Sequence, residues 1–474
     1  MRKLWLAFAA VMVVSFMVLG WVGTRIYQEM PPIPDKVVTT DGTTLIDSGE
    51  IGEGQNVWQT MGGMEVGSVW GHGSYTAPDW TADWLHREAV FMLDRWANDE
   101  FGKPFEELDE EYQGQLSSRL TQKFHANNYD AETGFLTIDP LRAEAFESNV
   151  EHYRTVFIDG NADYAIPSGA ISNDERLRKL SAFFFWTSWS AAADRPGDIA
   201  SYTNNWPHEP LAGNAPTPAN VLWSVVSVVV LLAGVVALVW WDSVRRRTHD
   251  APAAPPTDPL DGLTLTPSMR AAGKYCAVVI GLFVAQVGLG ALTAHYTVEG
   301  HGFFGIRLAD VLPYAVTRTW HVQLALFWIA TAFLAAGLFL APAVGGREPR
   351  YQRLGVNVLF GALLLVVLGS LAGEWMAVQH KLGPDATFWF GHQGYEYVDL
   401  GRFWQIALFV GLLLWLGLML RGLWPALRRR DDHRTLVRMF AGASVAIGLM
   451  YASGFFFSAR SHLSVMEYWR WWVV

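Results

Sequence analysis

Apolar windows of about 20 residues alternate with polar segments along most of the chain, and a helix of that length crosses the hydrocarbon core of a bilayer. The windows lie at Leu4 to about Ile26, then at about 220–241, 275–294, 315–340, 354–373, 403–420 and 437–457, and an eighth begins near Val465. A long polar and acidic stretch separates the first two windows. The pattern predicts a mainly α, polytopic membrane bundle with an N-terminal anchor helix and one sizeable domain outside the bilayer.

Basic residues are concentrated at one end of the chain and in alternate connections between the windows. Arg2 and Lys3 precede the first window, and later clusters lie at Arg245–Arg247, Arg347–Arg353 and Arg428–Arg434. Short loops rich in Lys and Arg tend to stay on the cytoplasmic side. This distribution predicts that the polar stretch, residues 28–218, lies on the extracytoplasmic side.

The windows and linkers divide the chain into five segments. These are an anchor at 1–27, an extracytoplasmic domain at 28–218, a transmembrane helix at 219–242, a cytoplasmic linker at 243–270 and a helical bundle at 271–474. The linker is rich in proline and has no periodicity. Within the outer domain, TADWLHREAVFMLDRWANDEF predicts a helix, and VVTTDGTTLIDS allows a short strand pair.

Composition excludes several classes of function. The single cysteine, Cys276, excludes disulfides within the chain and a Cys-x-x-Cys-His attachment site for covalent haem. The net charge of −10 and the short basic loops do not resemble a nucleic-acid-binding face. Any haem must therefore be held by side-chain ligation alone.

His321 is an imidazole in the apolar run TWHVQLALFWIATAFLAAGLFLAP. A polar ring in a membrane span is unfavourable unless it finds a partner. Its position allows two interpretations: the ring donates a hydrogen bond to a neighbouring carbonyl, or it is an axial ligand of haem iron. Small residues such as Ala325 and Gly337 would let either a flat macrocycle or another helix approach.

Two outward segments carry further candidate chemistry. His295 and Glu299 lie four residues apart and share one helical face if the helix continues. Beside Phe303 they could receive protons from a hydroquinone, or they are simply solvated at a helix end. Glu396 precedes the sixth window, where a carboxylate either complements the helix dipole or coordinates a hard cation such as calcium.

Several long segments resemble the single-subunit, quinol-dependent nitric oxide reductases of the haem-copper oxidase superfamily. They are GQNVWQTMGGMEVGSVWGHGSYTAPDWTADWLHREA, HYTVEGHGFFG, RTWHVQLALFWIATAFLAAGLFLAP and SHLSVMEYWRWWVV. The resemblance implies part of the haem-copper oxidase fold plus a cytochrome-c-like outer domain, in the cytoplasmic (inner) membrane of a bacterium. Relatives carry Cys-x-x-Cys-His shortly before Gly-x-Tyr-x-Ala-Pro, whereas this chain has no cysteine there, so the domain is expected to lack haem c and to be periplasmic.

The resemblance also assigns residues to three places. These are His321 as an axial ligand of low-spin haem b, His295, Glu299 and Phe303 at the quinol pocket, and Glu396, Gly73 and Tyr75 at a calcium near the haem propionates. The implied reaction is 2 NO + 2 e⁻ + 2 H⁺ to N₂O + H₂O, with electrons from membrane menaquinol or ubiquinol through haem b. The implied partners are quinol, nitric oxide and the bilayer, with no nucleic acid and with a homodimer of the full-length protein left open.

In the family, a His-x-x-x-Glu run follows the position where this chain ends, and later histidines complete the sites of a high-spin haem b and a non-haem iron. The non-haem iron ligands are therefore expected beyond Val474, and the chain is expected to be truncated, to contain no catalytic residue of its own and to be inactive alone. Three alternatives stay open: a non-catalytic membrane-anchored binding or sensing protein, a transporter, and another haem-copper oxidase. Few ionisable groups near the midplane argue against the transporter.

Overall fold

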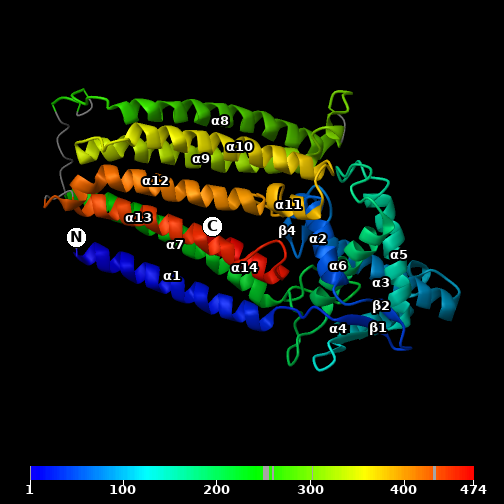
Figure 1. Ribbon diagram of the computed structural model, residues 1–474. Helices are drawn as coiled ribbons and strands as arrows, with labels where there is room; N and C mark the ends of the chain where they lie inside the picture. The colour runs from blue at the N-terminus through cyan, green and yellow to red at the C-terminus, as the bar shows by residue number, and fades with distance from the viewer. Residues whose placement is uncertain (1, 249–255, 259–260, 301–302, 431–433, 474) are drawn as a thin grey trace.

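A bundle of long helices and an outer domain make up the structure, a computed structural model that describes residues 2–248, 256–258, 261–300, 303–430 and 434–473 (Figure 1). Among these residues, seven helices are long and apolar enough to cross a membrane. They are α1 (Arg2–Glu29), α7 (Pro218–Thr248), α8 (Pro267–Glu299), α9 (Tyr314–Gly345), α10 (Gln352–Val378), α12 (Arg402–Arg428) and α13 (Arg434–Ser453). The mainly helical membrane bundle predicted from the sequence is confirmed.

Two shorter helices and two 3₁₀ turns accompany the bundle. They are α11 (Pro384–Phe390), α14 (Leu463–Val473), η3 (Leu308–Asp310) and η4 (Gly454–Phe456). Helix α14 begins close to Val465, where the sequence predicted the start of an eighth window, and its 11 residues are too few to count among the seven spans. It packs beside α1, and the Tyr468 hydroxyl donates a hydrogen bond to the Leu19 carbonyl at 3.0 Å.

Local sequence signals set the ends of the two helices that carry the candidate residues. Helix α8 begins with a Thr266 cap, whose hydroxyl accepts from the Met269 N–H, and with proline at its first position. It ends at Gly300, whose φ of +64° suits glycine. Helix α9 follows Pro313 and ends at Gly346 in the left-handed region.

Small residues let the bundle helices approach closely. Gly337 of α9 lies against the indole of Trp415 on α12, and Gly345 of α9 lies against the backbone of Gly422. The Trp415 Nε1–H donates to the Leu334 carbonyl at 3.1 Å. Such contacts are the usual means of helix association in lipid. By contrast, the apolar window of α8 has no fully buried residue, although α8 packs along α9.

The outer domain combines five helices with two small sheets. The helices are α2 (Glu50–Thr60), α3 (Trp80–Phe101), α4 (Glu110–His125), α5 (Pro140–Phe157) and α6 (Asp174–Ala192), with turns η1 (Gly63–Glu65) and η2 (Phe105–Glu107). The strands are β1 (Lys36–Thr39), β2 (Thr44–Ile46), β5 (Tyr129–Asp130) and β6 (Phe135–Ile138) in the order β2-β1-β6-β5, with β3 (Ser68–Val69) paired to β4 (His72–Gly73). The predicted helix and strand pair are both confirmed, as α3 and as β1–β2.

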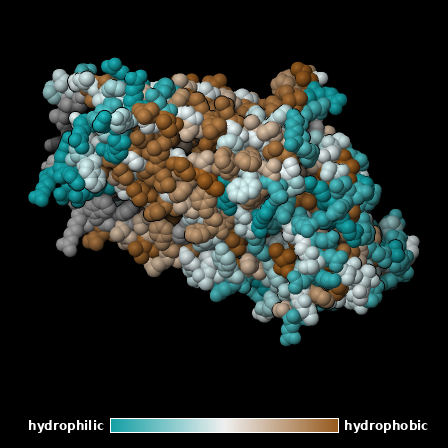
Figure 2. Space-filling model, in the orientation of Figure 1, coloured by the Kyte–Doolittle hydropathy of each residue, from teal (hydrophilic) through white to brown (hydrophobic). Residues whose placement is uncertain are grey.

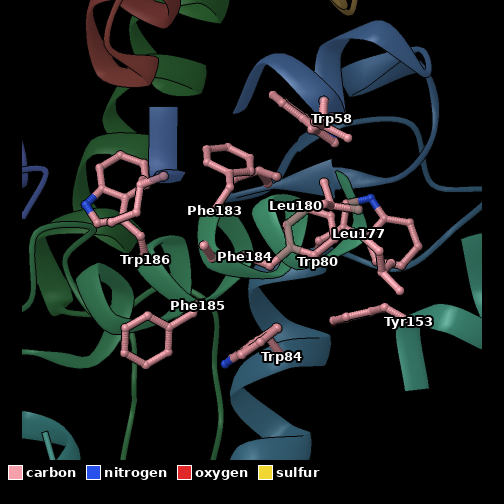
Figure 3. Packing of buried hydrophobic residues seen from close by; sticks show 14 of the residues in the cluster. Trp58, Trp80, Trp84, Tyr153, Leu177, Leu180, Phe183, Phe184, Phe185 and Trp186 are labelled. Atoms are coloured by element: carbon pink, nitrogen blue, oxygen red, sulfur yellow. The ribbon is translucent and has the colours of Figure 1, made fainter. Parts of the chain in front are cut away.

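Aromatic rings fill the core of this domain (Figure 3). The Trp80 ring stacks on Phe184 with centroids 5.5 Å apart, and Trp84 stacks on Tyr153 at 5.7 Å. Trp80 and Trp84 are completely buried. The domain is therefore packed around large rings contributed mainly by α3, α5 and α6.

Basic segments gather at the end of the bundle opposite the outer domain (Figure 1). The start of α1, the end of α7, the α9–α10 connection and the end of α12 share that end. Figure 2 shows hydrophobic surface along the helices between this hydrophilic end and the hydrophilic outer domain. The basic segments therefore share one end, and the cytoplasmic side of that end stays a prediction. The predicted linker falls partly on residues 249–255 and 259–260, outside the described residues.

Candidate functional site

His321 lies in the outer half of α9, against helix α8. Its Nδ1 is 2.9 Å from the backbone oxygen of Gln286, so the carbonyl partner considered from the sequence is present. Among the described residues its Nε2 has no hydrogen-bond partner, and it is not one of the buried unpartnered atoms. A half-buried ring with one open nitrogen fits an axial haem ligand. The ligand role itself stays a prediction.

His295, Glu299 and Phe303 lie together at the outer end of α8. The helix continues to Glu299, and Nε2 of His295 is 3.2 Å from Oε2 of Glu299. Phe303 meets the imidazole edge-on with centroids 4.9 Å apart, and Phe304 stacks on it at 5.3 Å. The His295 side chain is 13% exposed and the Glu299 side chain 56%. This geometry suits proton uptake beside an aromatic ring, and the quinol role stays a prediction.

The His321 ring and the His295–Glu299 pair are positioned by the same helix. His321 lies against Gly290 of α8, and His295 is the fifth residue after that glycine. With a rise of about 1.5 Å per residue, Gly290 and His295 are about 7.5 Å apart along the axis of α8. The two candidate sites are therefore close together along α8.

Glu396 is paired with arginines rather than with the other residues predicted to bind calcium. Its Oε1 lies 3.7 Å from Nη2 of Arg318, and its Oε2 lies 3.9 Å from Nη2 of Arg470. The Tyr75 side chain is 88% exposed. Within the described ranges no three His, Cys, Asp or Glu side chains form a group that could hold a metal ion. The side chains as arranged do not fit calcium, and the calcium site stays a prediction.

The strand that contains Gly73 nevertheless belongs to the same charged network as Glu396. Nδ1 of His72 lies 3.6 Å from Oε2 of Glu467, whose Oε1 lies 3.0 Å from Nη1 of Arg470. Arg470 in turn faces Glu396. The structure thus brings β4 and Glu396 into one neighbourhood through intervening side chains.

Glu65 joins the outer domain to the bundle, and the sequence did not single it out. Its carboxylate pairs with the guanidinium of Arg318, which also donates to the Glu396 backbone oxygen at 3.0 Å. Only 1% of the Glu65 residue surface is exposed. Burial raises the pKa of Glu65 to about 8; Arg318 opposes this rise and Asp399 adds to it. A sequence signal existed, because Arg318 lies three residues before His321 and is unusual beside an apolar window.

The segment that replaces the haem attachment motif is closed by the aromatic core. A Cβ on Gly67 would overlap the indole of Trp80, whose Nε1–H donates to the Val66 carbonyl at 2.8 Å. Trp80 itself is wholly buried. The expected lack of haem c therefore has a packing basis, although it stays a prediction.

The sequence predicts the ligands of the non-haem iron beyond Val474, and the structure does not test that expectation. The described part of α14 ends at Val473, and Val474 itself lies outside the described residues. The absence of a metal-binding group of His, Cys, Asp and Glu holds only for the described residues, which precede this point. The location of the catalytic iron ligands and the truncation of the chain both stay predictions.

Comparisons with known proteins agree with the division into an outer domain and a bundle. Residues 34–208 match the cytochrome c-like domain family of NorB, a nitric oxide reductase component, and residues 270–474 match "Cytochrome C and Quinol oxidase polypeptide I". The B subunit of nitric oxide reductase from Stutzerimonas stutzeri is 26% identical over 211 residues, which are 44% of this chain. The matched region spans 41% of that relative.

Proposed function

We propose that this chain, which joins a nitric oxide reductase cytochrome c-like domain to a cytochrome c and quinol oxidase polypeptide I domain, works in quinol-dependent reduction of nitric oxide. The observation that carries the proposal is the shared use of α8 by the two candidate sites. The His295–Glu299 pair lies at the outer end of α8. His321 belongs to α9, and its ring is hydrogen-bonded to the backbone of α8. This arrangement supports quinol oxidation next to an electron acceptor.

The His295–Glu299 pair supplies the proton chemistry of the quinol step. A quinol that becomes a quinone releases two electrons and two protons. The imidazole of His295 can take one proton and the carboxylate of Glu299 the other. Because Glu299 is 56% exposed, it can pass protons on to water, while Phe303 and Phe304 offer ring faces for the quinol head.

His321 would hold the electron acceptor in this proposal. Its Nε2 would bind haem b, which would supply one-electron redox chemistry there. Arg318, three residues earlier on the same helix, places a positive charge near that position. The role of this chain is then to bind quinol, to take its protons and to fix the acceptor beside it.

Nitric oxide as substrate is proposed over dioxygen because of the outer domain. Other haem-copper oxidases also fit the description of residues 270–474, whereas residues 34–208 match a domain described for nitric oxide reductase. Two NO, two electrons and two protons would give N₂O and H₂O. The outer domain, with its ring-filled core, acts here as a cap on the bundle and not as an electron carrier.

The test is the rate at which a short-chain quinol reduces haem in the purified chain under anaerobic conditions. We expect His295→Gln and Glu299→Gln each to slow the reduction about 100-fold or more, the usual size of general acid–base effects. His86→Gln is the matched control, because His86 lies in the outer domain and its side chain is 57% exposed.

Reduction by dithionite separates the possible failures. If dithionite reduces the haem of the wild-type chain but quinol does not, the quinol role is wrong. If neither reagent produces a haem spectrum, because no haem is bound, the chain is better explained as a non-catalytic membrane-anchored binding or sensing protein.

A further inference from the structure

The contact between His321 and α8 fixes which nitrogen carries the proton. Nδ1 of the ring lies 2.9 Å from the Gln286 backbone oxygen. A carbonyl oxygen has no proton to donate, so Nδ1 must be the donor. In the neutral imidazole, the lone pair then lies on Nε2, the nitrogen that has no hydrogen-bond partner among the described residues.

Gly290 provides the space for this ring. A Cβ at that position would lie 2.6 Å from Cε1 and 2.8 Å from Nδ1 of His321. The glycine is part of a regular helix, so its role is clearance and not an unusual backbone angle. Glycine destabilises a helix interior relative to alanine, and ring clearance explains its presence here. A Cβ on Gly281 or Gly288 of the same helix would meet nothing within 4 Å, so these two glycines provide no such clearance.

The Gln286 side chain ties the same turn of α8 to a second point on α9. Its Oε1 accepts a hydrogen bond of 2.7 Å from the Trp328 Nε1–H. Trp328 follows His321 by seven residues, which is about two helical turns, so both side chains project from one face of α9. Phe283 meets the Trp328 ring edge-on at 5.7 Å. One residue of α8 therefore holds α9 through its backbone and through its side chain.

We propose that Gln286, Gly290 and Trp328 are positioning residues that hold His321 as the Nδ1-protonated tautomer and present its Nε2 to an axial position of haem. The haem part of this inference rests on the proposed function, whereas the tautomer does not. A hydrogen bond to the distal ring nitrogen fixes the orientation of a metal-bound histidine and raises its basicity. His321 is only half-buried, so part of its surface stays exposed.

The first experiment measures the tautomer in the purified full chain before haem is added. The chain is labelled with ¹⁵N-histidine, and the signal absent from His321→Gln is assigned to His321. We expect a protonated Nδ1 and an unprotonated Nε2 in the wild type and in Gly288→Ala. Gly290→Val should abolish this pattern, because its side chain occupies the space of the ring.

The second experiment titrates the same proteins with haem. We expect Gly290→Val to weaken haem binding about 10-fold to 100-fold, the usual range for loss of support around a metal ligand. Trp328→Phe keeps an aromatic ring but removes the N–H donor. It should therefore weaken haem binding less than Gly290→Val does. Gly288→Ala should bind haem like the wild type.

The two experiments distinguish failure of this inference from failure of the proposed function. An Nε2-protonated His321, or a Gly290→Val variant that matches Gly288→Ala in tautomer and haem affinity, would overturn the inference. A wild-type chain that binds no haem would overturn the proposed function and the haem part of the inference. The tautomer data would then still decide whether Gln286 and Gly290 position the ring.

Discussion

The outer-domain core and the α8–α9 contact are the two regions where the family resemblance suggests haem. They differ in how closely side chains fill the space there. In the outer domain, Trp80 fills the space beside Gly67 and donates its N–H to Val66. At α8–α9, a glycine keeps space for His321, and Nε2 stays without a partner among the described residues. The first region is filled by packed rings, and the second leaves one nitrogen of a half-buried ring open.

The two regions differ in how each uses the space beside a glycine. The outer domain lacks the cysteines of the attachment motif, yet its rings provide a dense core that holds it on the bundle. The apolar window of α8 contains no fully buried residue, yet the polar groups around His321 have a defined orientation. Residues of the outer-domain core should therefore affect the free energy of unfolding. Residues around His321 should affect ligand binding.

The largest expected effect is loss of Trp80. We expect Trp80→Ala to lower the free energy of unfolding by about 3–5 kcal/mol, because it removes a buried indole and leaves a cavity. Chemical denaturation of the full chain in detergent measures this, with Ile199→Ala as a control, since Ile199 is 88% exposed. An unchanged denaturation midpoint for Trp80→Ala would contradict the closed core.

The second prediction concerns pH and the junction between the two regions. The pKa of Glu65 is raised from 4.5 to about 8 in the folded chain, so the folded state keeps a proton that the unfolded state loses. Stability should therefore fall as pH rises from about 4.5 to about 8, by up to about 1.4 kcal/mol per unit. Denaturation midpoints at pH 6 and pH 8 measure this fall.

The matched variant is Glu65→Gln, which resembles the protonated carboxyl group and cannot titrate. We expect it to keep most of its stability at pH 6 and to show a smaller loss at pH 8 than the wild type. An identical pH dependence in both proteins would assign the effect to other groups.

A smaller effect on stability is expected at His321. His321→Gln removes one hydrogen bond from a half-buried ring, so the free energy of unfolding should fall by about 0.5–1.5 kcal/mol. This cost is well below that of Trp80→Ala, although His321 is the residue proposed to bind haem. A loss as large as that of Trp80→Ala would mean that the ring is a packing residue, and denaturation of both variants in parallel decides this.

The smallest effect is expected for the ion pair between Arg460 and Asp385, whose side chains are 57% and 90% exposed. Such exposed pairs contribute less than about 1 kcal/mol, because water and salt screen them. Arg460→Ala therefore sets the baseline of the denaturation series. A loss above about 2 kcal/mol, beyond the range of exposed pairs, would show that the outer loops are more tightly coupled than their exposure indicates.

Much of the architecture could be predicted from the sequence because it depends on local patterns. Apolar windows predicted the membrane helices, and the four-residue spacing of His295 and Glu299 predicted their shared face. Pairings between distant segments could not be predicted in the same way. Strand β6 adds in parallel to β1, and Glu65 meets Arg318 across 253 residues, because three-dimensional packing decides both.

The same limit applies to the candidate site. His321 could be identified as a polar ring in an apolar run, but its partner depends on how α8 and α9 pair. Glu396 stood out as a carboxylate at a helix start, yet its pairing with Arg318 and Arg470 required the folded arrangement. Sequence patterns identified the unusual residue in each case, and the structure identified what it touches.

The most direct test of the contrast between the two regions is the haem content of the purified full chain, measured by absorbance as haem bound per protein. We expect the wild type and Trp80→Phe to bind non-covalent haem b equally well, and His321→Gln to lose at least about 10-fold in haem affinity, the lower end for loss of a metal ligand's support. Haem retained by His321→Gln, or haem that depends on Trp80 and not on His321, would contradict the assignment of the open site to α8 and α9.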